Sequence, residues 1–261
     1  MKIVLTPIAG LIAIGLSCAA LGDAAVKPVA EINNKSFEGS VAIDAGLKSY
    51  PRLYVTLAAA GKRELAKWAA DAEHERKANP SEFGPERHWS FDRSYSLRSV
   101  VGRYVSVVRG DDTFSGGAHP NHLIDTLLWD AQTKKFISIR PFFGETRENG
   151  PTLSALAKVI RAAVAVEKET RGIAVENPDT DPELASVKPK LTALGGLALA
   201  PSTEKDKSAG FSVYFSPYAV GSYVEGPYIV FVPWTAFKAY LSPLGIALFG
   251  GERPQDDEKN E

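Results

Sequence analysis

Apolar residues recur at three- and four-residue spacing in two long segments of the chain. This spacing predicts one helix over residues 58–79 and a second over Pro151–Thr170. Because Pro51 restricts the backbone of the residue before it, we expect residues 50–53 to interrupt regular structure ahead of the first helix. A shorter helix is predicted over residues 234–241.

Alternating apolar and polar residues predict strands between and after the two helices. Residues 88–98 alternate strictly, which is typical of a half-buried antiparallel strand, whereas residues 102–108 are apolar enough to be buried on both faces. Short connections between the strands that follow the first helix predict a meander. The other expected strands are residues 40–44, 122–130, 136–139, 191–199, 210–215 and 228–232.

Helices and strands therefore occupy separate stretches of the sequence, which predicts an α+β fold of antiparallel sheets with two main helices. A chain of 261 residues suits one large domain or two small, intimately packed subdomains. We divide it into an N-terminal subdomain over residues 25–130 and a C-terminal subdomain over residues 131–242. Residues 243–261 are charged at their end and are expected to form a disordered tail.

The first 24 residues have the pattern of a signal peptide. Lys2 precedes an apolar stretch, and small residues around Ala24 predict cleavage there, so that the mature protein is periplasmic or secreted. An uncleaved anchor is one alternative, and lipidation at Cys18 is another, although Gly15 replaces the aliphatic residue that lipidation needs. Cys18 is the single cysteine, so cleavage leaves a mature chain without disulfides and without a membrane segment.

Charge and motifs exclude several classes of function. The chain has 30 basic and 31 acidic residues, and this balance gives no field that would attract nucleic acid. The sequence contains no nucleophile elbow, phosphate-binding loop or dinucleotide fingerprint, so we expect no cofactor. One catalytic alternative stays open, a metal-dependent hydrolase that uses His119, His122 and Asp112.

A glycine-containing loop over residues 111–121 is the most distinctive segment. Gly116 and Gly117 permit positive φ angles or a close approach of another chain, and Phe114 lies beside them. An aromatic side chain in such a loop is either a core residue or an exposed contact. The loop therefore predicts either a binding element or a rigid turn of the framework.

The letters F-S-G-G-A-H-P-N of residues 114–121 resemble the Y-T-G-G-A-H-P signature of a paired extracytoplasmic module. The first half of that module resembles the non-catalytic N-terminal domain of the peptidoglycan deacetylase PdaC. Its second half resembles the C-terminal domain of the anti-sigma factor RsiV, which binds lysozyme. Further matches follow in order over the range 37–241, at Trp129-Asp130, Thr133-Lys134, Phe142-Phe143, residues 215–227 and residues 232–234.

The resemblance implies an exported, non-catalytic binding or sensory module that recognises a peptidoglycan fragment or a wall-acting protein such as lysozyme. An inhibitor of lysozyme-type enzymes is an alternative. Ser115 and Ser222 replace the usual threonine and proline, and nothing resembles the deacetylase's catalytic domain or a cytoplasmic sigma-binding segment. The expected binding residues are Phe114, Ser115, Gly116, Gly117, His119, Asn121, Tyr218 and Tyr223, with the two tyrosines also suited to a framework role.

Overall fold

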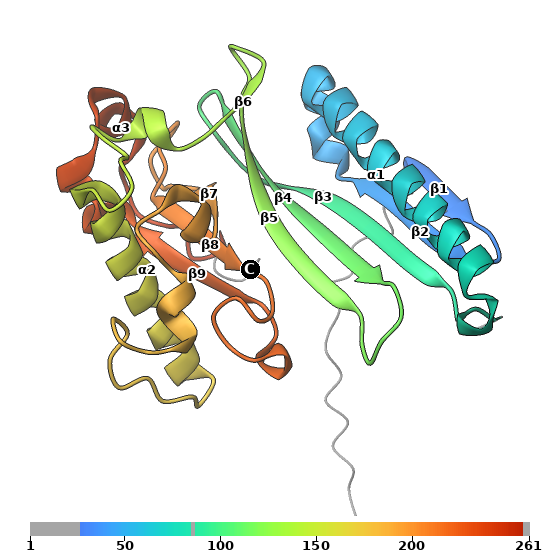
Figure 1. Ribbon diagram of the computed structural model, residues 1–261. Helices are drawn as coiled ribbons and strands as arrows, with labels where there is room; N and C mark the ends of the chain where they lie inside the picture. Colours follow the sequence, from blue (N-terminus) through green and yellow to red (C-terminus); the bar gives the residue numbers. More distant parts are fainter. Residues whose placement is uncertain (1–26, 85–86, 258–261) are drawn as a thin grey trace, which may run out of the picture.

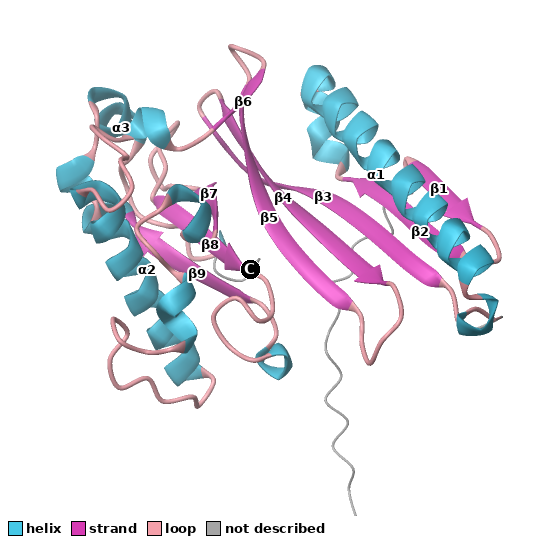
Figure 2. Cartoon of the chain, viewed as in Figure 1, coloured by secondary structure: helices cyan, strands magenta, loops and turns pink. Residues whose placement is uncertain are grey.

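The computed structural model describes residues 27–84 and 87–257 and shows an α+β fold, as predicted (Figures 1 and 2). The predicted signal peptide lies outside the described residues. Within the described part of the chain, no helix is long and apolar enough to cross a membrane. The strands form one sheet of six and one sheet of three.

The six-stranded sheet follows the chain in order from β1 to β6. The middle of this sheet is the predicted meander, in which each strand from β3 to β6 pairs antiparallel with the next. The strands are β1 (Ala30–Asn33), β2 (Phe37–Ile43), β3 (Trp89–Val101), β4 (Tyr104–Phe114), β5 (Asn121–Asp130) and β6 (Lys135–Ile137).

One pair departs from the antiparallel expectation, since β2 runs parallel to β3. Parallel neighbours need a long crossover connection, and helix α1 (Pro51–Ala78) supplies it by packing on β1, β2 and β3. Gly61 lets the helix lie close to β2, because a Cβ atom there would be 2.6 Å from the Val41 Cγ1 atom.

The start of α1 was predicted incorrectly. The helix begins at Pro51 rather than beyond residue 53, because a proline tolerates the first helical turn, where its missing N–H group has no partner to lose. Leu53, Leu57 and Leu65 of the helix are buried against the sheet. The segment that seemed to interrupt the structure therefore starts its longest helix.

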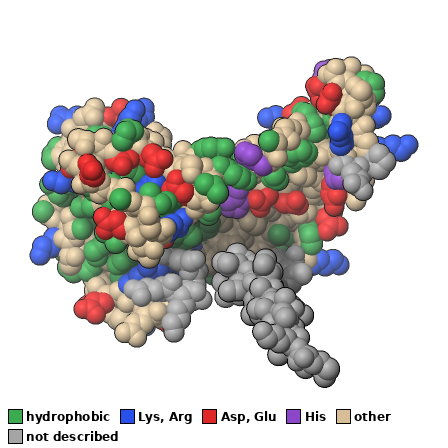
Figure 3. Space-filling model, turned by 90° about the horizontal axis from the view of Figure 1, so that it is seen from below, with side chains coloured by type: hydrophobic (Ala, Val, Ile, Leu, Met, Phe, Trp, Pro, Cys, Tyr) green, Lys and Arg blue, Asp and Glu red, His purple; other side chains and the backbone are tan. Residues whose placement is uncertain are grey.

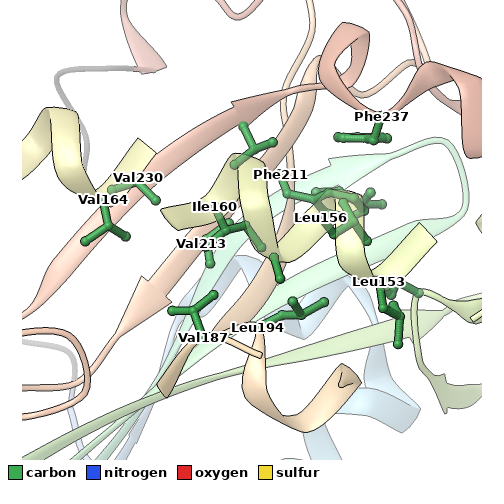
Figure 4. Close-up of a cluster of buried hydrophobic side chains, with 14 of the residues drawn as sticks. Leu153, Leu156, Ile160, Val164, Val187, Leu194, Phe211, Val213, Val230 and Phe237 are labelled. Carbon is green, nitrogen blue, oxygen red and sulfur yellow. The ribbon is translucent and has the colours of Figure 1, made fainter. Parts of the chain in front are cut away.

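The second sheet consists of β7 (Gly196–Ala200), β8 (Gly210–Phe215) and β9 (Tyr228–Pro233), in that order. Helix α2 (Pro151–Thr170) has the predicted bounds and packs against β9. Figure 4 shows the core between helix and sheet, where Ile160 and Val164 lie near Val213 and Val230. The expected strand over residues 191–199 is shorter, because Leu191–Ala193 forms a 3-10 turn.

Backbone and side chains join the two sheets at one end of β4. Val105 and Val107 of β4 belong to the core under α1. Ser106 points to the opposite face, where its Oγ atom accepts a hydrogen bond from the Leu199 N–H group of β7, 3.1 Å away. Ser99 Oγ donates to the Leu199 carbonyl oxygen at 2.5 Å. The layers are therefore α1, the large sheet, the small sheet and α2, and β4 is buried on both faces here, as predicted.

The C-terminal segment is ordered as far as residue 257, which corrects the expectation of a disordered tail from residue 243. Pro243–Leu248 forms helix α3, and Phe249 after it is buried. The two carboxylate oxygens of Asp257 accept hydrogen bonds from Nη1 and Nη2 of Arg98, each at 2.7 Å. This buried ion pair holds the segment against β3. The charged composition of the tail suggested disorder. The partner of Asp257 is 159 residues away in the sequence, so composition alone did not reveal the ion pair that holds the segment.

Two other boundaries differ from the sequence expectations. The segment expected as a helix over residues 234–241 consists of two 3-10 turns, Trp234–Ala236 and Lys238–Tyr240. Strand β4 continues to Phe114, so that Asp111 and Asp112 lie in the sheet and not in the loop. The division into subdomains at residue 130 stays a prediction, although the strand pairing itself places β6 in the large sheet.

Candidate functional site

The glycine loop joins the ends of β4 and β5 at the tip of the large sheet. Gly116 and Gly117 have φ angles of +92° and +107°, in the region that side chains disfavour, which is one of the two alternatives that the sequence left open. A Cβ atom at either position would meet nothing within 4 Å, so the loop backbone is open to solvent. The glycines therefore shape the turn rather than admit a neighbouring chain.

A second loop, over residues 216–227 between β8 and β9, reaches the glycine loop from the small sheet. Ser216 Oγ accepts a hydrogen bond from the Ile124 N–H group of β5 at 2.8 Å. Tyr223 donates its hydroxyl hydrogen to the Pro120 carbonyl oxygen, also at 2.8 Å. Two segments about one hundred residues apart are thus joined at one exposed end of the molecule.

His119, Tyr218 and Tyr223 form an aromatic cluster where these loops meet. The His119 and Tyr223 rings are stacked, with centroids 4.0 Å apart and planes 24° apart. His119 Nδ1 lies 2.8 Å from the Pro120 carbonyl oxygen, so this nitrogen donates a proton. The other nitrogen, Nε2, then accepts from the Tyr218 hydroxyl at 3.4 Å in the neutral ring.

Tyr218 is well exposed within this cluster. It is 63% exposed, and its φ angle is +69°, which is rare for a residue other than glycine, asparagine or aspartate. Such a backbone angle costs of order 1–3 kcal/mol and persists only where surrounding contacts hold it. The second loop therefore holds this ring outward at an energetic cost.

Helix α2 fixes the second loop through a buried cation. The side chain of Lys168 is fully buried, and its Nζ atom lies 2.7 Å from both Glu183 Oε2 and Glu225 Oε2. Burial opposes ionisation of both partners. The bonds to the two carboxylates nevertheless raise the pKa of Lys168, and the bonds from Lys168 and Tyr228 lower the pKa of Glu225 to about 2.

Glu225 in turn closes the short 3-10 turn that bears Tyr223. Its Oε1 atom accepts hydrogen bonds from the Ser222 N–H group at 2.7 Å and from Ser222 Oγ at 2.8 Å. Sequence reasoning missed this anchor, although a signal was present. Lys168 lies four residues after Val164 and so continues the apolar stripe of α2, where a lysine needs a buried partner.

The two histidines of the suggested metal site have separate partners. His122 Nδ1 lies 2.5 Å from Asp112 Oδ1, and this hydrogen bond raises the pKa of His122 in spite of partial burial. His119 instead bonds Pro120 and stacks on Tyr223. Among residues 27–84 and 87–257, no three histidine, cysteine, aspartate or glutamate side chains are placed to hold a metal ion.

The remaining predicted site residues lie on another side of the glycine loop. Phe114, Ser115, Gly116 and Gly117 line a hollow of about 360 Å³, together with Trp89 at the start of the neighbouring strand β3 and Phe83 from the segment after α1. Asn121 is exposed and pairs with Thr113 at the start of β5. The eight residues therefore surround one loop but do not form a single surface.

Figure 3 looks onto this end of the molecule and shows histidine side chains beside a band of acidic side chains. The acidic residues Asp92 and Asp112 face each other directly across β3 and β4. Ser40 Oγ donates to Asp92 at 2.5 Å, and His122 bonds Asp112. The open face of the sheet beside the aromatic cluster is thus polar, in contrast to its buried end.

Comparison with protein-family models and with curated proteins gave no match. Solved structures that share the fold include two DUF3298 family proteins. A member of the DUF3298 family from Bacteroides fragilis has a TM-score of 0.53 and 14% identity, covering 83% of this chain and 93% of its own. A DUF3298 family protein from Pseudomonas aeruginosa has a TM-score of 0.52 and 15% identity, covering 85% and 91%. The chain therefore has the α+β fold seen in these two DUF3298 family proteins.

Proposed function

We propose that the protein is an exported, non-catalytic binding module that recognises a cell-wall component or a wall-acting protein such as lysozyme. The main support is the cluster of His119, Tyr218 and Tyr223, which two loops from different sheets hold at an exposed end. Tyrosine is enriched at recognition surfaces because it combines a large apolar ring with a polar hydroxyl.

The resemblance to the PdaC and RsiV modules supports the same proposal. It nominated the glycine loop and the segment of residues 215–227 independently of each other. These are the segments that meet, and the bond between Tyr223 and Pro120 links them directly. The predicted signal peptide supports a place outside the cytoplasm, where wall fragments and wall-acting enzymes occur.

Binding by the chain from residue 25 onward tests the proposal against two ligands, lysozyme and soluble peptidoglycan fragments. We expect Tyr218→Ala to weaken binding by about tenfold or more, because an exposed ring at an interface centre commonly contributes that much. Phe136→Ala is the matched control, since this ring is 41% exposed and lies on β6, where it pairs with Trp129 at the far end of β5 from the cluster.

Failure of the unaltered protein to bind either ligand contradicts the proposal, as does equal binding by Tyr218→Ala. Lysozyme turnover measured in the same samples separates recognition from inhibition. Turnover that falls as the protein saturates the enzyme supports the inhibitor alternative, whereas binding with unchanged turnover supports a recognition module.

A further inference from the structure

Two adjoining hollows lie at the end of the large sheet, beside the last turns of α1. The larger has a volume of about 560 Å³, and the smaller, of about 360 Å³, includes the backbone of the glycine loop. Both are lined by Phe83 and His88, so these two side chains separate them. Their sizes fall in the range of small-ligand pockets, about 300–1,000 Å³.

Aromatic rings form one wall of the smaller hollow. Phe83 stacks on Trp89 with centroids 6.3 Å apart, and Trp89 meets Trp68 edge to face at 6.1 Å. Trp68 is stacked on Phe91 of the core, which fixes the group from behind. Phe83, Trp89 and Phe114 are each only half-buried, so apolar ring surface remains available to a ligand.

Polar groups of both charges line the same hollow. Glu75 and Glu82 contribute carboxylates, Arg87 contributes a guanidinium group, and His88 contributes an imidazole. A simple cation or anion would meet a repelling group here. Hydroxyl groups both donate and accept hydrogen bonds, so an uncharged polyol can use all of them.

The larger hollow, on the other side of Phe83, is also lined by polar groups. Its lining includes the amides of Asn33 and Asn34 and the ammonium group of Lys35. The Asn34 side chain is held in place, because its Oδ1 atom accepts hydrogen bonds from the Ser36 and Phe37 N–H groups at 2.9 and 3.0 Å. Its amide nitrogen is thereby oriented and retains its donor hydrogens.

From these observations we infer that the two hollows bind an oligosaccharide, with one sugar ring against the Phe83 and Trp89 rings and the next beyond Phe83. Sugar rings have an apolar C–H face that suits an aromatic wall and hydroxyl groups that suit the mixed polar lining. This inference rests on the proposed function and names a ligand class for it. It uses different side chains from the cluster of His119, Tyr218 and Tyr223.

The test uses the chain from residue 25 onward and the tetramer of N-acetylglucosamine, with binding followed by calorimetry and by tryptophan fluorescence. We expect saturable binding that Phe83→Ala weakens by about tenfold or more. Glu82→Gln, a change of an exposed side chain, is expected to weaken it less. Phe136→Ala is expected to leave the affinity within about twofold, because Phe136 lines neither hollow.

The outcomes separate this inference from the proposed function. Loss of sugar binding in Phe83→Ala, with an unchanged unfolding midpoint, supports the oligosaccharide site. The inference is overturned if the unaltered protein shows no saturable binding of the sugar, or if both Phe83→Ala and Glu82→Gln bind it with unchanged affinity. It is also overturned if the hollows bind an oligolysine peptide and not the sugar. If Tyr218→Ala weakens lysozyme binding while no sugar binds, the proposed function holds and this inference fails.

Discussion

The two ends of the large sheet differ in what covers them, although the same strands run through both. At one end, β4 lies between the core under α1 and the small sheet, and residues 104–107 are all buried. At the other end, residues 115–121 are all exposed. The difference separates two roles along one strand pair: the covered end supplies stability, and the uncovered end presents side chains to a partner.

Polar groups follow the same division. At the covered end, Ser99 and Ser106 bond the backbone of Leu199 and so satisfy the outer edge of β7. At the uncovered end, polar side chains bond their neighbours within the sheet, as His122 does with Asp112. The two serines hold the two sheets together, whereas the more exposed bond between His122 and Asp112 can be replaced with little cost to folding.

The largest expected effect comes from two residues on the same face of β5. Trp129 is 4% exposed in the core under α1, and Leu123, near the glycine loop, is 53% exposed. We expect Trp129→Ala to lower the free energy of unfolding by about 3–5 kcal/mol, because it leaves a large cavity. Leu123→Ala is expected to change it by less than about 0.5 kcal/mol.

Urea unfolding followed by circular dichroism measures both values. The comparison between the two ends fails if the two variants lose similar stability. It also fails if Trp129→Ala unfolds at the same midpoint as the unaltered protein, because the covered end would then contribute nothing special to the fold.

The next effect concerns the buried cation that holds the second loop. Lys168→Met keeps the length of the side chain but leaves Glu225, whose side chain is 11% exposed, without its cation. We expect a loss of about 3 kcal/mol in the free energy of unfolding, since breaking a buried ion pair leaves an uncompensated charge. The double variant Lys168→Met with Glu225→Gln is expected to recover part of it, and no recovery contradicts the role of the pair.

The sequence predicted the regular parts of this molecule well and the long-range contacts poorly. Helix α2 has its predicted bounds, and the alternation of residues 88–98 identified β3, because both patterns repeat within one element. The parallel pairing of β2 with β3 and the bond of Arg98 to Asp257 depend on residues far apart in the chain. Periodicity within an element contains no information on either contact.

The candidate site also contains some features that the local sequence indicated and others that depend on the fold. Residue type alone permitted the positive φ angles of Gly116 and Gly117, although it did not distinguish them from a close approach of another chain. The stacking of His119 on Tyr223 needs the fold, because the two residues come from different sheets. Their approach could be inferred only from a family resemblance, and the placement of Phe114 apart from Tyr218 could not be inferred at all.

A smaller effect is expected in acid. The folded-state pKa of Glu225 is about 2, below its ordinary value of 4.5, because Lys168 and Tyr228 favour the charged form against the opposing effect of burial. The stability from this group is therefore complete above about pH 5 and is lost as the pH falls through about 2. Asp257, whose pKa is also lowered by its arginine partners against burial, acts in the same direction.

Unfolding midpoints measured across this acid range in the unaltered protein and in Lys168→Met isolate the share of Glu225. Without the cation, the pKa of Glu225 moves back toward its ordinary value, and the fall in stability with acid becomes shallower. An identical acid dependence in the two proteins would show that Lys168 does not stabilise the ionised form of Glu225.

The smallest effect concerns His122 at the uncovered end. The hydrogen bond to Asp112 raises the pKa of His122, so the stability from this pair is complete below the ordinary histidine value and is lost as the pH rises through the raised one. The Asp112 side chain is 62% exposed and that of His122 is 35% exposed, so Asp112→Asn is expected to change the free energy of unfolding by less than about 1 kcal/mol.

The same substitution is expected to lower the pKa of His122, which an NMR titration of the imidazole resonances follows directly. Asp125→Asn is the control, because Asp125 lies on the opposite face of β5, where it pairs with Arg109. Equal shifts of the His122 titration in the two variants would mean that the whole field at this end, rather than the bond to Asp112, sets its protonation. A stability loss of several kcal/mol in Asp112→Asn would make the uncovered end as important to folding as the covered one, and the division between the two ends would not hold.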